Sequence, residues 1–387
     1  MTANYPLLIT CPKGISPWLA REVQALGLSV ERELPLGVQT RGGLHEAMLL
    51  NLHLRTGHRV LLELKHFHAP DAALLHARAV KIPWEEWIPA DGYVTVHASV
   101  SHRGREHSGH AALKIKDAVV DRIRKRTGRR PDAGSEQRGA AVFLHWQADR
   151  ATVYLDTSGD ALSKRGYRLQ PHTAPLQETL AAAIVLASGY EDGHFVNPMC
   201  GSGSLACEAG LLACNMAPGL LRERFAFMGL LGYRNTAFDE LREQARAARV
   251  DAPRGRIIVT DHDPAAVEAA RANARRAGLE QHMEFAVCDF QETVVPEVDS
   301  ALPGTIVLNP EYGVRLGQEE ALAETYAAIG DFFKQRCSGY TGGVFTGNPA
   351  LGKRVGLKTR RRIPFFNARI ECRLLLYELY AGSRKGN

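Results

Sequence analysis

The sequence lacks the patterns that would assign it to a membrane or a secretory pathway. No apolar run approaches the ~20 residues that a helix needs to span a bilayer. The first residues contain no basic segment that leads into an apolar one, so a secretory signal is not indicated. We therefore expect a cytoplasmic protein with no membrane partner.

Cysteines are few, and they are not spaced as metal ligands usually are. The chain has 7 cysteines among 387 residues, an odd number, and no two of them form a Cys-x-x-Cys pair. This excludes a disulfide framework and the common zinc patterns. Cys200, Cys207 and Cys214 could suggest a metal face, but their spacing is more typical of small buried residues on a helix. We expect no metal.

The stretch from 194 to 205 reads as a strand, a glycine loop and a helix, with the sequence His-Phe-Val-Asn-Pro-Met-Cys-Gly-Ser-Gly-Ser-Leu. Gly201 and Gly203 let the backbone turn sharply and approach a ligand closely. The helix that follows points its free N–H groups at the loop, which suits a nucleotide-like ligand. Taken alone, the pattern also fits an ordinary turn.

Two departures argue against a nicotinamide cofactor. Ala206 stands where a dinucleotide fingerprint has its third glycine. Asp261, which ends the next strand, lies 60 residues after Gly201, whereas a nicotinamide-binding fold has its acidic residue about 20 residues on.

A second apolar strand, Thr305–Leu308, ends in Asn309-Pro310-Glu311-Tyr312. A strand with a proline turn is the plain alternative. However, the Asn309 side-chain oxygen and the Pro310 carbonyl offer two acceptors to the two hydrogens of an exocyclic amino group. The Tyr312 ring offers a face on which a base can stack. With the glycine loop upstream, the motif indicates chemistry on an amino group of a nucleobase.

Several motifs follow one another in a fixed order. They occupy residues 158–168, 174–181, 197–204, 261–263, 288–290 and 309–317. This order resembles the bacterial RNA guanine-N-methyltransferases that carry a THUMP domain. Members of that family usually have Asn-Pro-Pro-Tyr, and here Glu311 stands at the third position. Its carboxylate could accept from the ring N–H of guanine, or it could face solvent or pair with Arg315.

The resemblance implies S-adenosyl-L-methionine as the cofactor and the exocyclic 2-amino group of a guanine in structured RNA as the target. We expect 23S ribosomal RNA as the partner, with transfer RNA as the runner-up. Methylation of adenine N6 is a weaker alternative. A catalytically inactive RNA-binding protein is the weakest, supported only by Glu311. The sequence does not determine the oligomeric state.

Site residues follow from these motifs. Asp261 can hold the ribose hydroxyls, whereas Asp263, before Pro264, is interpreted as a helix N-cap. The resemblance implies that Asp289 meets the adenine amino group with Phe290 beside the ring; a solvated loop aspartate is the alternative. The expected catalytic residues are Asn309, Pro310 and Tyr312. The expected cofactor-binding residues are Asn197, Met199, Cys200, Gly201, Ser202, Gly203, Asp261, His262, Asp289, Phe290 and Asn309.

Positive charge is modest in sum, +6, but gathered in two places. Residues 122–130 hold six positive charges, and 353–362 hold a second group. Either run alone would more often be a solvated face. In a chain that handles a nucleobase, two such runs favour phosphate contacts. The expected RNA-binding residues are Lys114, Arg124, Lys125, Arg126, Arg129, Arg130, Arg360 and Arg361.

The expected fold class is α/β. Alternating strands and helices after residue 194 predict a Rossmann-like class I methyltransferase domain, with a mostly parallel sheet and helices on both faces. An α+β ferredoxin-like/THUMP RNA-binding region precedes it, with a hairpin at 142–155. A helix is expected to open at Ala174-Pro175, and the stretch 216–254 carries no clear pattern. The expected domains are 1–64 (ferredoxin-like), 65–160 (THUMP) and 161–387 (linker helix and methyltransferase).

Overall fold

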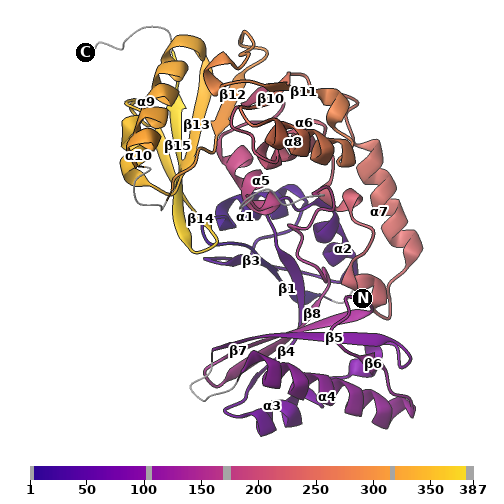
Figure 1. The fold of residues 1–387 in the computed structure, drawn as a ribbon. Coiled ribbons are helices and arrows are strands. Elements are labelled where there is room, and N and C mark those ends of the chain that lie inside the picture. Colours follow the sequence, from indigo (N-terminus) through magenta and orange to yellow (C-terminus); the bar gives the residue numbers. More distant parts are fainter. Residues whose placement is uncertain (1–3, 102–106, 169–175, 314–318, 381–387) are drawn as a thin grey trace. The chain divides into compact units, whose positions relative to one another are not determined.

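The computed structural model describes residues 4–101, 107–168, 176–313 and 319–380. The chain forms two compact units, each with its own sheet (Figure 1). The first unit comprises residues 1–11, 19–162 and 222–244. The second comprises 12–18, 163–221 and 245–387. No helix in the described ranges is both long and apolar enough to cross a membrane.

The sheet of the first unit has the strand order β2-β3-β1-β4-β8-β7-β5-β6. β5 pairs in parallel with β6 and β7, and the other neighbours are antiparallel. β4 contains residue 64, so strands from both expected N-terminal domains belong to one sheet. The predicted hairpin is confirmed as β7 and β8. The strands are β1 (Tyr5–Thr10), β2 (Arg32–Leu34), β3 (Gly37–Gly42), β4 (Arg59–His68), β5 (Tyr93–Ser101), β6 (Asp132–Ala133), β7 (Ala140–Gln147) and β8 (Arg150–Asp156).

The helices of the first unit include α4, which packs on β5 and against α3 (Figure 1). α4 ends where Gly128, at φ 75°, donates its N–H to the Arg124 carbonyl. α7 lies in the stretch 216–254, for which no clear pattern was found in the sequence. The helices are α1 (Ser16–Ala25, of which 16–18 group with the second unit), α2 (Leu44–His53), α3 (Ala72–Ala79), η1 (Trp84–Glu86), α4 (Ser108–Thr127), η3 (Ala226–Gly229) and α7 (Asn235–Ala247, of which 245–247 group with the second unit).

The sheet of the second unit has the strand order β11-β10-β9-β12-β13-β15-β14. The first five strands are parallel, and β15 and β14 are added in antiparallel pairing. The α/β fold is therefore confirmed, although β14 and β15 were not expected. The strands are β9 (His194–Asn197), β10 (Ile257–Asp261), β11 (Met283–Val287), β12 (Gly304–Leu308), β13 (Tyr340–Thr346), β14 (Arg361–Asn367) and β15 (Ile370–Glu378).

Helices of the second unit form two groups: α5, α6 and α8 pack together, and α9 packs with α10. Figure 1 shows α9 and α10 beside β13 and β15, away from α6 and α8. α5 begins at Glu178 rather than at Ala174-Pro175, which lie outside the described residues. The helices are α5 (Glu178–Ala187), α6 (Ser204–Ala213), η2 (Pro218–Leu221), α8 (Pro264–Arg276), η4 (Glu280–His282), η5 (Phe290–Glu292), α9 (Glu319–Arg336) and α10 (Pro349–Arg354).

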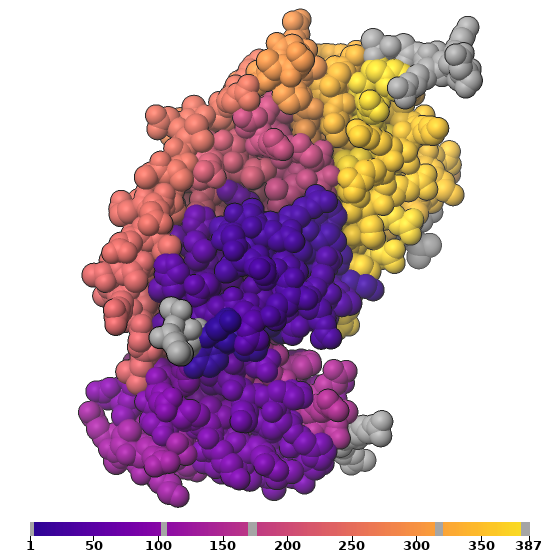
Figure 2. Space-filling model, turned by 180° about the vertical axis from the view of Figure 1, so that it is seen from behind, coloured from indigo at the N-terminus to yellow at the C-terminus, as the bar shows by residue number. Residues whose placement is uncertain are grey.

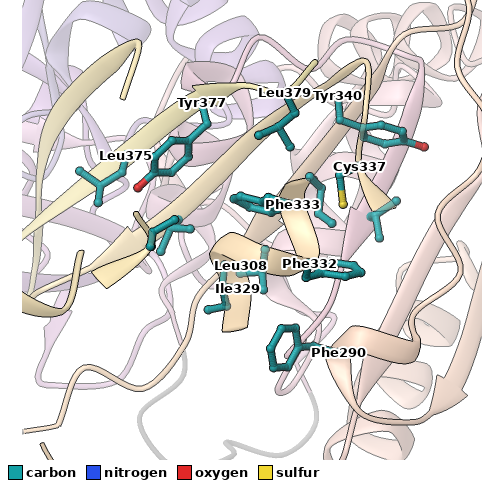
Figure 3. Close-up of a cluster of buried hydrophobic side chains, with 14 of the residues drawn as sticks. Phe290, Leu308, Ile329, Phe332, Phe333, Cys337, Tyr340, Leu375, Tyr377 and Leu379 are labelled. Carbon is teal, nitrogen blue, oxygen red and sulfur yellow. The ribbon is translucent and has the colours of Figure 1, made fainter. Parts of the chain in front are cut away.

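A large apolar cluster joins α9 to the sheet of the second unit. Phe332 and Phe333 of α9 lie among Leu308 of β12 and Tyr377 of β15, all almost completely buried (Figure 3). Burial of such side chains is worth roughly 1.5–3 kcal/mol each. The cluster fixes the strands whose ends carry the candidate site. Residues toward the C-terminus, yellow in Figure 2, cover part of the face shown there.

The three cysteines of the glycine-loop region are buried, as their spacing predicts. Cys200 precedes α6, Cys207 lies within it, and Cys214 is its C-cap. Burial raises the pKa of all three thiols. They therefore contribute to packing as small apolar side chains.

Candidate active site in the second unit

The glycine loop and the Asn-Pro-Glu-Tyr motif meet at the centre of the parallel sheet. β9 pairs with β10 on one side and with β12 on the other, so the chain order reverses there. Ligands of open α/β sheets bind at this switch point, beyond the carboxyl ends of the strands. Asn197 ends β9 and Asn309 directly follows β12. Asn197 Nδ2 donates to the Val307 carbonyl at 2.9 Å, which ties the two strand ends together.

The loop after β9 needs its glycines for backbone conformation. Met199, Gly201 and Gly203 have φ values of 55°, 52° and 75°, a region that costs little only for glycine. A Cβ at Gly203 would lie 2.8 Å from Cβ of Ala270, so this position must also stay small for α8 to pack. A Cβ at Gly201 would meet nothing within 4 Å, which leaves open space beside the loop backbone.

Neighbouring elements hold the loop by its backbone. The Cys200 N–H donates to the Thr260 carbonyl at 3.0 Å. Asn273 of α8 donates through Nδ2 to the Ser202 carbonyl at 2.9 Å, and its side chain is buried. Asn273 was not predicted, because it lies 71 residues from its partner in an otherwise ordinary helix.

Asp261 joins the end of β10 to the glycine loop. Its Oδ2 accepts from the Gly201 N–H at 2.9 Å, and its Oδ1 accepts from the Asp263 N–H at 3.1 Å. His262 Nδ1 lies 3.3 Å from Oδ1, with its side chain 81% exposed. Each carboxylate oxygen can accept more than one hydrogen bond, so Asp261 can also receive hydroxyl donors.

Asp263 is the N-cap of α8, as predicted. Its side chain accepts from the Ala265 N–H at 2.9 Å, and Pro264 occupies the first turn. This local role accounts for its position next to Asp261.

Asp289 and Phe290 lie in different environments, although they are adjacent. The exposed Asp289 caps η5 by accepting from the Gln291 N–H at 2.9 Å. Phe290 is 8% exposed and meets the edge of Phe332 at a centroid distance of 5.8 Å (Figure 3). The apolar cluster therefore covers most of the Phe290 ring, whereas the Asp289 carboxylate is accessible.

Two carboxamide oxygens at the switch point have no hydrogen-bond donor. Asn197 Oδ1 and Asn309 Oδ1 are buried atoms without a partner among the described residues. Leaving a buried acceptor unsatisfied costs about 1–3 kcal/mol. Such an atom in a folded protein calls for an explanation, and a ligand that supplies a donor is one.

The remaining residues of the motif differ in exposure. Pro310 is buried and Glu311 is exposed. Arg315, with which Glu311 could pair, lies outside the described residues.

Tyr312 is held by the turn between β14 and β15. Its hydroxyl accepts from Nδ2 of Asn367 at 2.9 Å, and its ring meets the edge of Phe345 at 6.5 Å. A Cβ at Gly347 would lie 2.8 Å from the Tyr312 ring, so only glycine leaves room for it. Burial raises the pKa of the Tyr312 hydroxyl, which keeps it protonated. Neither Asn367 nor Gly347 was predicted, because Asn367 lies 55 residues from Tyr312 in the sequence and Gly347 follows a different strand, β13.

Buried charges support the start of α6. Arg168 donates through Nη2 to the Ser204 hydroxyl at 2.9 Å and lies 3.1 Å from Glu178. Arg165 pairs with Glu208 of α6 at 3.3 Å, with both side chains essentially inaccessible. Removing one partner of such a pair typically costs 3–5 kcal/mol. These contacts explain why two arginines of the 158–168 motif lie so close together in the sequence.

The basic end of α4 is partly neutralised by acidic neighbours. Arg122 makes a bidentate pair with Glu85 at 2.7–3.2 Å, and these hydrogen bonds lower the pKa of the Glu85 carboxyl. Of the expected RNA-binding residues, Lys114, Lys125 and Arg130 have no acidic partner in the part of the chain that the structure describes. The paired ones are Arg124 with Asp121 (3.4 Å), Arg126 with Glu85 (3.6 Å) and Arg129 with Asp91 (3.4 Å).

The other expected RNA-binding residues lie at the start of β14. Arg360 precedes the strand and donates its backbone N–H to the Leu376 carbonyl at 2.7 Å. Arg361 is the first residue of β14, and both side chains are exposed.

Three family models match this chain. Residues 165–375 match the "RMKL-like, methyltransferase domain", residues 6–61 the "RlmL ferredoxin-like domain", and residues 71–156 the "THUMP domain". The chain belongs to the RMKL-like methyltransferase family. The resemblance read from the motifs is thereby confirmed at the level of the family and its three domains.

Known relatives and solved structures extend this assignment. The "Ribosomal RNA large subunit methyltransferase K/L" of Syntrophotalea carbinolica is 40% identical, over 98% of this chain and 54% of the relative. The chain thus spans about half the length of the curated relatives it matches. A structure of SMU.472, described as a methyltransferase complexed with SAH, is 26% identical with a TM-score of 0.87 and covers 100% of both chains.

Another solved structure carries a different activity in its name. The structure of a "predicted N6-adenine-specific DNA methylase" from Listeria monocytogenes is 27% identical, with a TM-score of 0.86. It covers 98% of this chain and 97% of its own.

Proposed function

We propose that this protein is an S-adenosyl-L-methionine-dependent RNA methyltransferase that acts on the 2-amino group of a guanine in large-subunit ribosomal RNA. The observation that carries this proposal is the buried, unpartnered Asn309 Oδ1, directly before the Pro310 carbonyl at the switch point of the sheet. Two acceptors in sequence match the two hydrogens of an exocyclic amine. Tyr312 supplies a ring next to them for the base.

The residues at the switch point fit the cofactor. The space beside Gly201, which a Cβ would enter, admits a ligand close to the loop backbone. Asp261 is positioned by two backbone N–H groups and can accept from both ribose hydroxyls. The accessible Asp289 carboxylate can accept from the adenine amino group. Asn197, Met199, Cys200, Ser202, Gly203, His262, Phe290 and Asn309 complete the cofactor side in this proposal.

The cofactor supplies an already activated methyl group on its sulfonium, so the protein has to align the amine and raise its electron density. Hydrogen bonds from the amine to Asn309 Oδ1 and to the Pro310 carbonyl draw its lone pair out of the ring. The nitrogen becomes more pyramidal and more nucleophilic. Stacking of the base on Tyr312 contributes about 1–3 kcal/mol to holding it in place.

In this proposal, the ferredoxin-like and THUMP regions, 1–64 and 65–160, bind the RNA, and residues 161–387 transfer the methyl group. The unpaired Lys114, Lys125 and Arg130 are the first candidates for phosphate contacts. The paired Arg124, Arg126 and Arg129 remain more than half exposed. They can therefore exchange a carboxylate for a phosphate. Exposed Arg360 and Arg361 add charge in the second unit.

Three rivals rank behind this proposal. Transfer RNA is a structured RNA to which the same site chemistry applies. Adenine N6 is also an exocyclic amine, and the name of the Listeria neighbour includes that activity. A catalytically inactive RNA-binding protein is disfavoured, because Asn309, Pro310 and Tyr312 are all present.

The test is nucleoside mass spectrometry after incubation of the protein with S-adenosyl-L-methionine and RNA from a strain that lacks its gene. We expect N2-methylguanosine in the large-subunit RNA, formed about 10²–10³ times more slowly by an Asn309→Ala variant. N2-methylguanosine in transfer RNA alone would favour the runner-up. N6-methyladenosine would favour the adenine activity. Bound cofactor and RNA without any methyl transfer would indicate the inactive protein.

A further inference from the structure

A pocket of about 210 Å³ lies between α10 and the β14–β15 hairpin in the second unit. We propose that it binds a phosphate of the RNA backbone next to the target guanine, an inference that rests on the proposed function. Three cations, Lys353 of α10, Arg362 of β14 and Arg373 of β15, line it together with Glu371. The remaining lining residues are Thr346, Pro349, Gly352, Leu357, Thr359 and Leu375.

Strand register explains why these cations converge. Arg362 is opposite Leu375, and Arg373 is opposite both Pro364 and Thr346. Because alternate residues of a strand share a face, Arg373 points to the same side as Leu375. Leu375 belongs to the buried apolar cluster beneath α9 (Figure 3). The pocket is therefore where this face of the sheet changes from apolar to charged.

The pocket has a surplus of positive charge. Arg373 lies 3.4 Å from Glu371 with its side chain 44% exposed, and Arg362 Nε donates to the Thr359 hydroxyl at 3.0 Å. The ammonium group of Lys353 has no hydrogen bond or ion pair with any residue in the described ranges. Two arginines can bind phosphate oxygens through paired N–H groups, and lysine adds a point charge. An anion with several acceptor oxygens suits this set.

The pocket shares its framework with the proposed base site. Thr346 of its lining is followed by Gly347, on which the Tyr312 ring rests. Asn367, at the end of β14, holds the Tyr312 hydroxyl. By strand alternation, Gly347 and Asn367 face the opposite side of these strands from the pocket residues Thr346, Arg362 and Arg373. In this proposal, RNA that reaches both sites passes around the end of the hairpin, so the phosphate in the pocket flanks the target guanine.

The pocket is lined by Arg362 and Arg373, not by Arg360 and Arg361, which were expected from the sequence to bind RNA. Arg361 is adjacent to Arg362 in β14, so its side chain leaves the opposite face of the strand. Arg360 precedes the strand and does not line the pocket. Arg362 and Arg373 are 11 residues apart in the sequence, and the pairing of β14 with β15 brings them to one pocket.

The test compares the double variant Arg362→Gln/Arg373→Gln with a matched control, Arg336→Gln/Arg354→Gln, which removes the same charge outside the pocket. RNA affinity is measured over a range of salt concentrations. Each lost phosphate contact should reduce the salt slope by about 0.7–0.9. We expect that loss for the pocket variant, with unchanged cofactor affinity. The charge-preserving Arg362→Lys/Arg373→Lys variant should retain the slope, and it shows whether the fold tolerates substitution.

A second arm identifies the phosphate. RNA with a single neutral methylphosphonate linkage next to the methylated guanine should bind the wild type more weakly. The same linkage should cause no further loss in the Gln variant. An unchanged slope in the pocket variant, an equal loss in the control, or equal effects of all linkages would each overturn the proposal. An RNA that is bound but never methylated would instead contradict the proposed function, and the salt slopes would still test the pocket.

Discussion

The candidate site has a cofactor side, around the glycine loop and Asp261, and a base side, formed by Asn309, Pro310 and Tyr312. The two sides differ in how many of their polar groups form hydrogen bonds within the protein. On the cofactor side, the backbone of Cys200, Gly201, Ser202 and Gly203 is hydrogen-bonded within the protein, and Asp261 is held from two sides. Each side keeps one buried carboxamide oxygen without a donor among the described residues, Asn197 Oδ1 on the cofactor side and Asn309 Oδ1 on the base side. The loop backbone on the cofactor side is thus held by the protein itself, whereas the Asn309 acceptor on the base side is left for a ligand.

Asn309→Ala should have the largest effect, and it should affect only the base side. The substitution removes the unpartnered acceptor without touching the loop hydrogen bonds. We expect a loss of about 10²–10³ in the methyl-transfer rate, the range measured when one transition-state hydrogen-bonding group is removed. Cofactor affinity should stay within a few-fold.

Single-turnover rates and calorimetry with the cofactor measure these two effects. Asn309→Asp is the matched control, because it keeps an acceptor oxygen and should lose less. Full turnover of the Ala variant would exclude Asn309 from catalysis.

Asp261→Ala should act on the other side of the site. Hydrogen bonds to a charged acceptor are worth about 1.5–3 kcal/mol each, so cofactor affinity should fall roughly tenfold to more than a hundredfold. Calorimetry measures the affinity directly.

The neighbouring Asp263→Ala is the control, because the Asp263 side chain caps α8. It should lower the stability by about 1 kcal/mol without changing cofactor affinity. Unchanged affinity in Asp261→Ala would mean that the ribose is held elsewhere.

Substitutions of Glu311 should have the smallest effect. They test whether this residue of the base side contributes to the choice between guanine and adenine. Its side chain is exposed, so we expect Glu311→Gln and Glu311→Pro to keep the wild-type rate and base preference. The measurement is methyl transfer to RNA with guanine or adenine at the target position. A reduced preference for guanine in the Gln variant would instead mean that the carboxylate accepts from the guanine ring N–H.

Local motifs were the part of the site that could be predicted. The glycine loop and the Asp263-Pro264 cap were recognisable because their function depends on backbone conformation within a few residues. Phe290 has a second role that its motif did not indicate. The expected ligand contact stays a prediction, and in the structure the ring also packs in the apolar cluster, which covers most of it.

The sequence by itself determined the alternation of strands and helices, the positions of the glycine loop and the Asn-Pro loop at strand ends, and the family resemblance. Each of these depends on neighbours along the chain. Only the tertiary structure decided which distant side chains hold those loops. Asn273 meets Ser202 across 71 residues, Asn367 meets Tyr312 across 55, and Arg168 meets Ser204 across 36. Sheet register and helix packing bring these pairs within hydrogen-bond distance, and neither can be read from local sequence.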